Sequence, residues 1–273
     1  MGDKVAVLID GFNFYHAISS HINSVSYPEN LKWPDYDKLV RNVLLKNRQY
    51  DDLKINFYTA INTYKCDSHG KPHKSTVNHR IYTDALKTKN IEVIEGQFKL
   101  RDERLNSYYV CKNCNNTQFI HRFKVTFPDK ITCVKCNSEF AEEDFKCIKK
   151  PEEKKTDVKI AIDLINIARD GNYNKIFLFS TDSDFIPPVE YIKKNCSAEI
   201  IIVAPSDKFE IKRYNEKKQK LEIVSAYRYG TTEFSKLGVT VLRLKLSKLI
   251  NCLFDNEIKT SYGRILRNPW AKN

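Results

Sequence analysis

The sequence predicts an α/β fold, with a central, mostly parallel sheet into which a small module is inserted. Apolar, strand-like runs alternate with helix-like stretches over residues 1–96, and the same alternation resumes after residue 155. Between these regions the pattern changes to charged residues and cysteines. Alternating strands and helices are typical of crossover connections, which join parallel strands. One α/β domain with an insertion accounts for this order better than two tandem domains.

Residues 1–96 contain three predicted strands separated by helices. The apolar run "KVAVLID" (4–10) ends in an acid before Gly11, and "YDKLVRNVLLK" (36–46) has the spacing of an amphipathic helix. In chain order the predicted elements are a strand at 4–10, helices at 12–22 and 36–46, a strand at 53–61, a helix at 75–89 and a strand at 91–96.

The second half repeats this alternation after "KKPEEKK" (149–155), which has the composition of a solvated linker. The predicted elements are a helix at 156–170, a strand at 175–180, a turn and helix at 184–194, a strand at 198–204, a helix at 207–220 and a last strand at 221–226. We therefore expect a core of residues 1–96 and 150–226, an inserted module at 97–149 and a basic C-terminal extension at 227–273.

The formal charge of +12 favours a polyanionic partner, with nucleic acid first and an acidic membrane surface second. The alternative is an ordinary lysine-rich, solvated surface. From Ser206 to Asn273 the chain has 15 Lys or Arg against 7 Asp or Glu, so this quarter carries most of the excess. We expect no signal peptide, because the first apolar run, "KVAVLID", is short and ends in an acid, and no apolar run approaches the roughly 20 residues that span a bilayer. We expect a cytoplasmic protein.

Four of the eight cysteines form two Cys-x-x-Cys pairs, "CKNC" and "CVKC", with 18 residues between them. Two thiolates on each of two tight turns complete a tetrahedral Zn²⁺ shell, and the spacing is typical of a zinc ribbon. We expect Cys111, Cys114, Cys133 and Cys136 to hold a structural zinc, with a hairpin built from residues 117–127 between the pairs. An iron–sulfur cluster is the minor alternative. The other predictions here are that Cys66 and Cys147 are spare and that His121 lies on the surface.

Acidic residues follow two of the predicted strands. Asp10 ends the first strand, and Asp182 and Asp184 come directly after "KIFLFS". Ligands of open parallel sheets bind beyond the carboxyl ends of the strands, so these side chains are expected to meet there, with Asp157 reaching the same crevice. Such a cluster repels itself unless cations neutralise it, and oxygen ligands suit Mg²⁺ or Mn²⁺. Each acid taken alone is also compatible with a turn or a helix cap.

The segments "VAVLIDGFNFYH", "FYTA", "EKKTDVKIAIDL" and "FLFSTDSDFIPPV" resemble the NYN domains, a bacterial branch of the PIN-like nucleases. The motif order agrees as well, with "VIEGQF" before the insertion and "IIIVAP" after the aspartate pair, so the resemblance covers about residues 3–225. It implies a three-layer PIN-like fold and a metal-dependent ribonuclease that hydrolyses RNA endonucleolytically at an aspartate-bound Mg²⁺ or Mn²⁺ site.

The resemblance also implies the site residues. The metal ligands would be Asp10, Asp157, Asp182 and Asp184, with Asn13 assisting catalysis, while Ser180 and Thr181 are candidates for positioning a carboxylate or water. This sequence has Thr181 where relatives often have glycine, which puts the approach to Asp182 in doubt. Asp163, six residues after Asp157, points about 240° further around the helix and so does not share its face.

Two alternatives to the ribonuclease remain open at this point. One is a weakly catalytic or non-catalytic module that binds RNA or DNA through the ribbon and the basic tail. The other is a phosphatase-like or topoisomerase-like acidic site, whose usual acids "LIDGFN" lacks. The tail has two interpretations: a track for RNA with stacking by Tyr227, Tyr229, Tyr262 and Trp270, or an amphipathic element at 241–254 that packs on the core or on a second subunit.

Overall fold

The structure of the chain is a computed structural model. It describes residues 2–24, 29–66, 70–121, 131–140, 146–205, 208–215, 220–227 and 231–271. None of the described helices is both long and apolar enough to cross a membrane.

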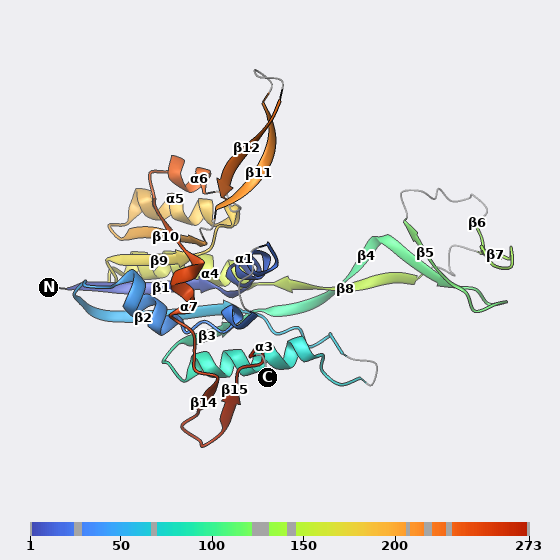
Figure 1. Cartoon of the computed structure of the whole chain (residues 1–273), viewed down its shortest axis with the longest axis horizontal. Coiled ribbons are helices and arrows are strands. Elements are labelled where there is room, and N and C mark those ends of the chain that lie inside the picture. The colour runs from blue at the N-terminus through green and yellow to red at the C-terminus, as the bar shows by residue number, and fades with distance from the viewer. Residues whose placement is uncertain are drawn as a thin grey trace.

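The centre of the molecule is a six-stranded sheet in which every neighbouring pair is parallel (Figure 1). The strand order is β13-β10-β9-β1-β2-β3. The strands are β1 (Asp3–Asp10), β2 (Tyr50–Thr59), β3 (Glu92–Glu95), β9 (Lys175–Phe179), β10 (Glu199–Pro205) and β13 (Thr240–Leu244). From β1 the chain builds outward through β2 and β3, and it later returns to the other side of β1 as β9. The strand order therefore reverses between β1 and β9.

Helices cover both faces of this sheet, which confirms the predicted three-layer α/β fold. One face carries α1 (Gly11–Ser24), α2 (Tyr36–Leu39) with its π-helical continuation η2 (Val40–Leu44), α3 (Lys74–Lys87) and α7 (Leu246–Ile250). The other face carries α4 (Thr156–Asp170), α5 (Ile186–Asn195) and α6 (Thr232–Lys236). Two short 3-10 turns, η1 (Glu29–Lys32) and η5 (Ser183–Phe185), complete the described helical segments.

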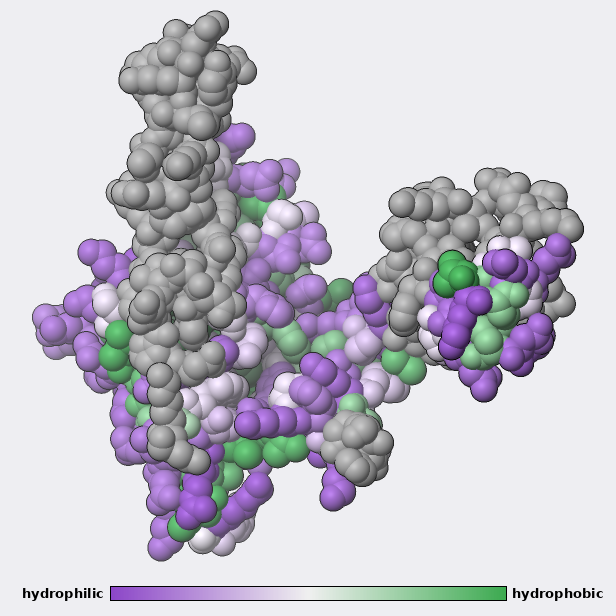
Figure 2. All heavy atoms as spheres, turned by 45° about the vertical axis from the view of Figure 1, so that its right-hand side comes forward, coloured by the Kyte–Doolittle hydropathy of each residue, from purple (hydrophilic) through white to green (hydrophobic). Residues whose placement is uncertain are grey.

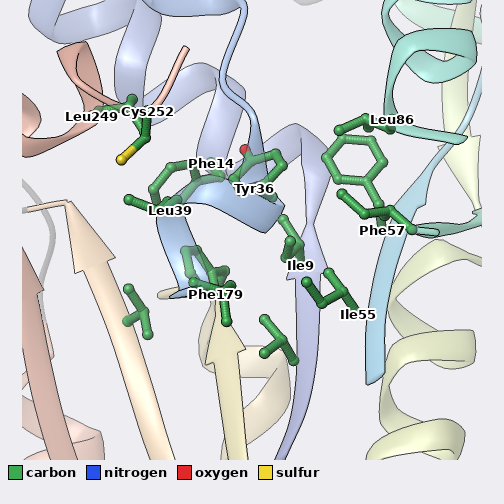
Figure 3. Packing of buried hydrophobic residues seen from close by; sticks show 14 of the residues in the cluster. Ile9, Phe14, Tyr36, Leu39, Ile55, Phe57, Leu86, Phe179, Leu249 and Cys252 are labelled. Carbon is green, nitrogen blue, oxygen red and sulfur yellow. The ribbon is translucent and has the colours of Figure 1, made fainter. Parts of the chain in front are cut away.

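The alternation of side chains along β1 divides the core into two clusters. Val5, Val7 and Ile9 pack in the cluster under α1, whereas Ala6 and Leu8 pack in the cluster under α4. The first cluster is rich in aromatic rings, as Figure 3 shows for Phe14, Tyr36, Phe57 and Phe179. Because successive strand residues point to opposite faces, Asp10 shares the face of Ala6 and Leu8.

The insertion forms an arm that extends from the body on the side opposite the N-terminus (Figure 1). Its base is an antiparallel pair of β4 (Gln97–Val110) and β8 (Lys146–Lys154). The predicted linker at 149–155 is therefore wrong for most of its length, because its charged residues lie in a strand. Most of this strand stands outside the body and has no apolar core to face, so its backbone is satisfied by pairing while its side chains are polar.

The end of the arm is built from three further strands, β5 (Thr117–His121), β6 (Ile131–Thr132) and β7 (Glu139–Phe140). The predicted hairpin at 117–127 takes a different form in its described part, because β5 pairs with β4 across the first Cys-x-x-Cys turn. In the same way, β6 pairs with β7 across the second turn. Residues 122–130 lie outside the described residues, as do the side chains of His121 and Cys147.

The predicted helix at 207–220 is wrong. Residues 208–215 form β11 (Lys208–Asn215), which pairs antiparallel with β12 (Lys220–Tyr227). The segment "KFEIKRYN" alternates polar and apolar residues for its first five positions, and this period of two is the strand pattern that its high charge obscured. The last strand predicted at 221–226 exists as β12, but it belongs to this hairpin and not to the central sheet.

The C-terminal extension packs on the body, as one interpretation of its amphipathic segment predicted. The stretch that was ambiguous between strand and helix contains both, since β13 joins the sheet edge and α7 contributes Leu246 and Leu249 to the core. A short hairpin of β14 (Glu257–Lys259) and β15 (Ile265–Arg267) follows. The Trp33 ring lies 5.6 Å from that of Phe254 and 6.0 Å from that of Trp270.

Hydrophilic residues cover most of the described surface on the face in Figure 2.

Candidate active site

The carboxyl ends of β1 and β9 are joined by a hydrogen-bonded network around Asp10. The backbone N–H of Asn13 donates to Asp10 Oδ1 (3.0 Å), and the buried Ser180 hydroxyl donates to Asp10 Oδ2 (2.9 Å). Asn13 Oδ1 accepts from the backbone N–H of Thr181 (3.3 Å), and Ser180 Oγ accepts from that of Asp182 (3.2 Å). The network holds Asp10 in one orientation at the point where the strand order reverses, which is the usual ligand site of doubly wound sheets.

Gly11 allows α1 to begin immediately after Asp10. A Cβ atom at Gly11 would lie 2.7 Å from the carbonyl oxygen of Tyr58 and 2.5 Å from the Phe57 ring. Only a residue without a side chain permits this close approach of α1 to β2. The sequence "IDGFN" therefore sets both the acid and the start of the helix that holds it.

Asp182 and Asp184 follow β9 in a single tight turn. Asp182 caps η5, because its Oδ1 accepts the backbone N–H of Asp184 (3.0 Å). The predicted capping function is thus present, yet it uses one oxygen of Asp182 and leaves the other. Asp157 stands in the first turn of α4, and its pKa is raised by partial burial and by the charges of Asp182 and Asp184. The structure therefore brings all four predicted acids to one edge of the sheet.

Burial and mutual repulsion both act on these carboxyl groups. The pKa of Asp10 is raised to about 6, mainly by burial and further by the charges of Asp157 and Asp182, against the opposing effect of its hydrogen bonds from Asn13 and Ser180. Among the described residues, no Lys or Arg forms an ion pair with Asp10, Asp157, Asp182 or Asp184. A cluster of carboxylates without basic partners is suited to bind a hard cation.

Glu153 is a fifth acid at this site, and no motif in the sequence predicted it there. Its position at the end of β8 puts it beside α4, and burial followed by the charges of Asp10 and Asp157 raises its pKa to about 7. Glu153 Oε1 is buried without a hydrogen-bond partner. The adjacent Glu152 points the other way, where it pairs with Arg101 (3.3 Å) and Lys154 (2.9 Å). A strand assignment for "PEEK" would have revealed this division, because neighbouring strand residues face opposite sides.

The turn before α4 fixes the place of Glu153 and Asp157. Lys155 adopts a left-handed backbone conformation (φ 76°) between β8 and the helix. Gly96 packs against the same turn, where a Cβ atom would come within 3.0 Å of the Lys154 carbonyl oxygen and still closer to Thr156 Oγ1. The base of the arm is thus pressed against the start of α4.

Asp163 does not join the acidic cluster. Its Oδ2 accepts a hydrogen bond from the fully buried Tyr58 hydroxyl (2.7 Å), which also accepts from Asn56 Nδ2 (3.2 Å). This bond ties α4 to β2 and agrees with the prediction that Asp163 and Asp157 use different faces of the helix. Asp163 therefore has a structural partner of its own.

The acidic edge offers the ligands that Mg²⁺ or Mn²⁺ requires. Both ions prefer oxygen donors, and Mg²⁺ is usually held by one or two carboxylates together with water and phosphate oxygens. Asp10 has the hydrogen-bonded support that orients metal-binding carboxylates, from Ser180 and from Asn13. The orphan oxygen of Glu153 is a further acceptor at the same place.

A second candidate metal site lies at the end of the arm. The four sulfur atoms of Cys111, Cys114, Cys133 and Cys136 lie within 4.8 Å of one another. The Sγ–Sγ distances are 3.5 Å for Cys111–Cys136 and 3.6 Å for Cys114–Cys133. A tetrahedron with Zn–S bonds of about 2.3 Å has edges of about 3.8 Å, so the donor set fits one tetrahedral ion.

The two turns of this cluster have the same backbone geometry. Each first cysteine accepts an N–H bond of 2.8 Å from an asparagine four residues later, and these residues, Asn115 and Asn137, have φ values of 55° and 60°. Asparagine tolerates this left-handed conformation better than most residues. Hydrogen bonding by Ser138 lowers the pKa of the Cys111 thiol, which favours the thiolate that binds metal. Cys66 is exposed and takes no part in the cluster.

Comparison with known proteins gives one family and one similar structure. No curated protein matches the chain. A solved protein of unknown function from Vibrio parahaemolyticus is similar, with 17% identity over 75% of this chain and 82% of that chain and a TM-score of 0.38. Residues 104–223 match the family model of the NYN domain, a range that contains the four cysteines, Glu153, Asp157, Asp182 and Asp184. Over residues 104–223, the chain is therefore similar to NYN domains.

Proposed function

We propose that this protein is a metal-dependent endoribonuclease whose acidic edge binds Mg²⁺ or Mn²⁺. NYN domains are generally nucleases, which supports hydrolysis of a phosphodiester bond in a nucleic acid. The observation that carries the proposal is the meeting of Asp10, Asp157 and Asp182 at the reversal of strand order, with no described basic partner. RNA is the proposed substrate, with DNA as the second candidate, and the charge of +12 favours either polyanion.

In this proposal the residues of the site have different roles. Asp10, Asp157, Asp182 and Asp184 would hold the cation, which when bound would supply activation of a water molecule and stabilisation of the leaving oxygen. Ser180 and Asn13 orient Asp10, while Thr181 holds the Asn13 carboxamide. Ser180 and Thr181 would therefore act through Asn13 and the acids more than through the substrate. Glu153, close to Asp10, is positioned to add a further charge to the same ion or to accept a proton from water.

We also propose that the four-cysteine cluster holds a structural Zn²⁺ and does no chemistry. A shell of four thiolates leaves no open position for a substrate. The described arm has no apolar core of its own, since the two core clusters lie in the body. A metal ion would supply the stability that such a small module lacks.

The function is tested by cleavage of RNA with Asp182→Asn and a matched control, Asp163→Asn. Both variants replace a carboxylate by a carboxamide, and only Asp182 belongs to the acidic cluster. We expect purified protein to cleave RNA with Mg²⁺ or Mn²⁺, EDTA to stop cleavage, and Asp182→Asn to reduce the rate at least about a hundredfold. Asp163→Asn should cleave normally.

Unreduced cleavage by Asp182→Asn would refute the proposed mechanism. If the protein instead binds RNA tightly at low salt, without cleavage and without dependence on metal or Asp182, it is a nucleic-acid-binding module. Trapping RNA on Asp182→Asn in cells, followed by sequencing, would then name the substrate.

A further inference from the structure

A cavity of about 330 Å³ lies beside the acidic edge, on the other face of the sheet. It opens between α1 and α3, where its lining includes Gly11 and Phe12 from the start of α1 and Thr59 from the end of β2. The volume falls at the lower end of the roughly 300–1,000 Å³ of small-molecule sites. Nothing in the proposed metal chemistry uses this cavity.

Aromatic rings form one side of the cavity. The Phe12 ring lies 5.9 Å from that of Phe98 and 5.7 Å from that of His79, and both contacts are edge-to-face. Trp270 from the C-terminal extension also contributes to the lining. Aromatic side chains that line a cavity are suited to contact a nucleic-acid base, since bases stack on aromatic rings.

Polar groups in the same cavity are suited to read the edge of a flat, polar ligand. His79 Nε2 is bonded to Thr59 Oγ1 (2.8 Å), and its other ring nitrogen has no partner among the described residues. Burial lowers the pKa of His79 to about 4, so the ring is neutral at physiological pH and can donate or accept. Asn78 also lines the cavity, and its carboxamide bonds no other described residue.

The cavity is connected to the acidic cluster in two ways, along the chain and through a strand pair. Phe12 is two residues after Asp10 on the same turn. Phe98 is paired with Glu153 across β4 and β8, and paired residues of antiparallel strands have Cα atoms about 4.5–5.5 Å apart. Lys65 also lines the cavity and brings a positive charge to it. Two aromatic residues of the cavity, Phe12 and Phe98, are thus neighbours of two acids, Asp10 along the chain and Glu153 across the strand pair.

We propose that this cavity binds one unstacked nucleobase of the RNA, adjacent to the phosphodiester that is cleaved. Phe12 and Phe98 would contact the base faces, while His79 and Asn78 would contact its edge. This inference rests on the proposed function for its substrate. It adds that base identity at one position next to the cleaved bond sets the preference of the enzyme.

The test uses full-length Asp182→Asn protein with Mn²⁺ and a set of RNA oligonucleotides, each with one abasic residue at a different position. We expect one position at which loss of the base weakens binding roughly tenfold. Phe98→Leu and Asn78→Ala, added separately, should abolish this difference between intact and abasic RNA. Tyr191→Leu is the matched control, because Tyr191 is an exposed aromatic residue of α5 that does not line the cavity.

A second measurement separates this inference from the proposed function. Binding of nucleoside monophosphates to metal-free protein, observed by ligand-detected NMR, requires no cleavage and no acidic site. Binding that Phe98→Leu removes, in a protein without ribonuclease activity, would support the cavity and refute the function. Metal-dependent cleavage that shows no abasic position and no effect of Phe98→Leu or Asn78→Ala would overturn the cavity and leave the function standing.

Discussion

At the residue scale, Glu153 is the acid whose role is least visible in the sequence. Removing its charge should lower the affinity of the site for Mn²⁺, because carboxylate charge sets the strength of hard-cation binding. We expect Glu153→Gln to weaken Mn²⁺ binding roughly tenfold in calorimetric titration. The metal-free variant should also melt at a higher temperature, since the repulsion between Glu153, Asp10 and Asp157 is reduced.

The adjacent Glu152→Gln is the control for this prediction. It changes the same side chain one position earlier, on the face where Arg101 and Lys154 pair with it. Equal Mn²⁺ affinities for the two variants would show that Glu153 does not act on the metal.

A second residue-scale prediction concerns the bond between Tyr58 and Asp163. Tyr58→Phe removes the donor to the carboxylate and leaves Asn56 without its acceptor, so it should lower the free energy of unfolding by about 1–3 kcal/mol. Asp163→Asn keeps an oxygen acceptor and should cost less. Urea unfolding measures both. A loss of metal binding in Asp163→Asn would contradict its structural role.

At the scale of elements, the arm should depend on its metal and the body should not. We expect Cys114→Ser to reduce bound zinc from about one ion per chain to nearly none, because a three-thiolate remnant binds weakly. The variant should become sensitive to protease between residues 111 and 146, while the main thermal transition of the body shifts little. Cys66→Ser, which changes an exposed cysteine outside the cluster, is the control. A large fall in the Tm of the body would contradict this independence.

The elements that the sequence predicted well are those with a clear apolar period. The helix predicted at 156–170 is α4, and the strand predicted at 4–10 is β1 with one more residue. Both bury one or two faces against the core, so the positions of their apolar residues in the sequence predict which faces are buried. The order of motifs also placed Asp10 and Asp182 at strand ends, from which a shared edge follows for adjacent parallel strands.

The elements that were missed lie outside the core. Residues 208–215 and 146–154 form paired strands away from the sheet, and their charged residues obscure the strand pattern. Charged residues there suggested a helix and a linker, since pairing partners far apart in the chain are not visible locally. For the same reason the sequence did not indicate Glu153, which reaches the other acids because β8 pairs with β4.

At the scale of the whole molecule, the C-terminal extension completes the core around Trp33. The indole nitrogen of Trp33 donates to the Asp255 carbonyl oxygen (3.1 Å), and Phe254 donates its N–H to the Trp33 carbonyl oxygen (3.1 Å). Tyr82 packs against Trp33 and also against Trp270. The extension therefore connects residues near both ends of the chain, and one of its rings, Trp270, lines the proposed base pocket.

The last prediction links the stability of the whole protein to pH and metal. The pKa of Asp10 is raised from 3.8 to about 6, so the folded state binds this proton more tightly than the unfolded state. The cost of folding with a charged Asp10 is absent below pH 4 and fully present above pH 6, where it amounts to about 3 kcal/mol. The free energy of unfolding of the metal-free protein should therefore fall by this amount as pH rises from 4 to 6.

The measurement compares metal-free wild type with Asp10→Asn from pH 4 to pH 7, because the variant shares every other charge. Wild type should equal the variant at low pH and become the less stable of the two as pH rises. Saturating Mn²⁺ should remove the deficit, since a cation neutralises the charge that burial penalises. A difference between the two proteins that stays constant with pH would show that Asp10 is not held protonated in the folded state. A deficit that Mn²⁺ does not relieve would show that the acidic edge is not its binding site.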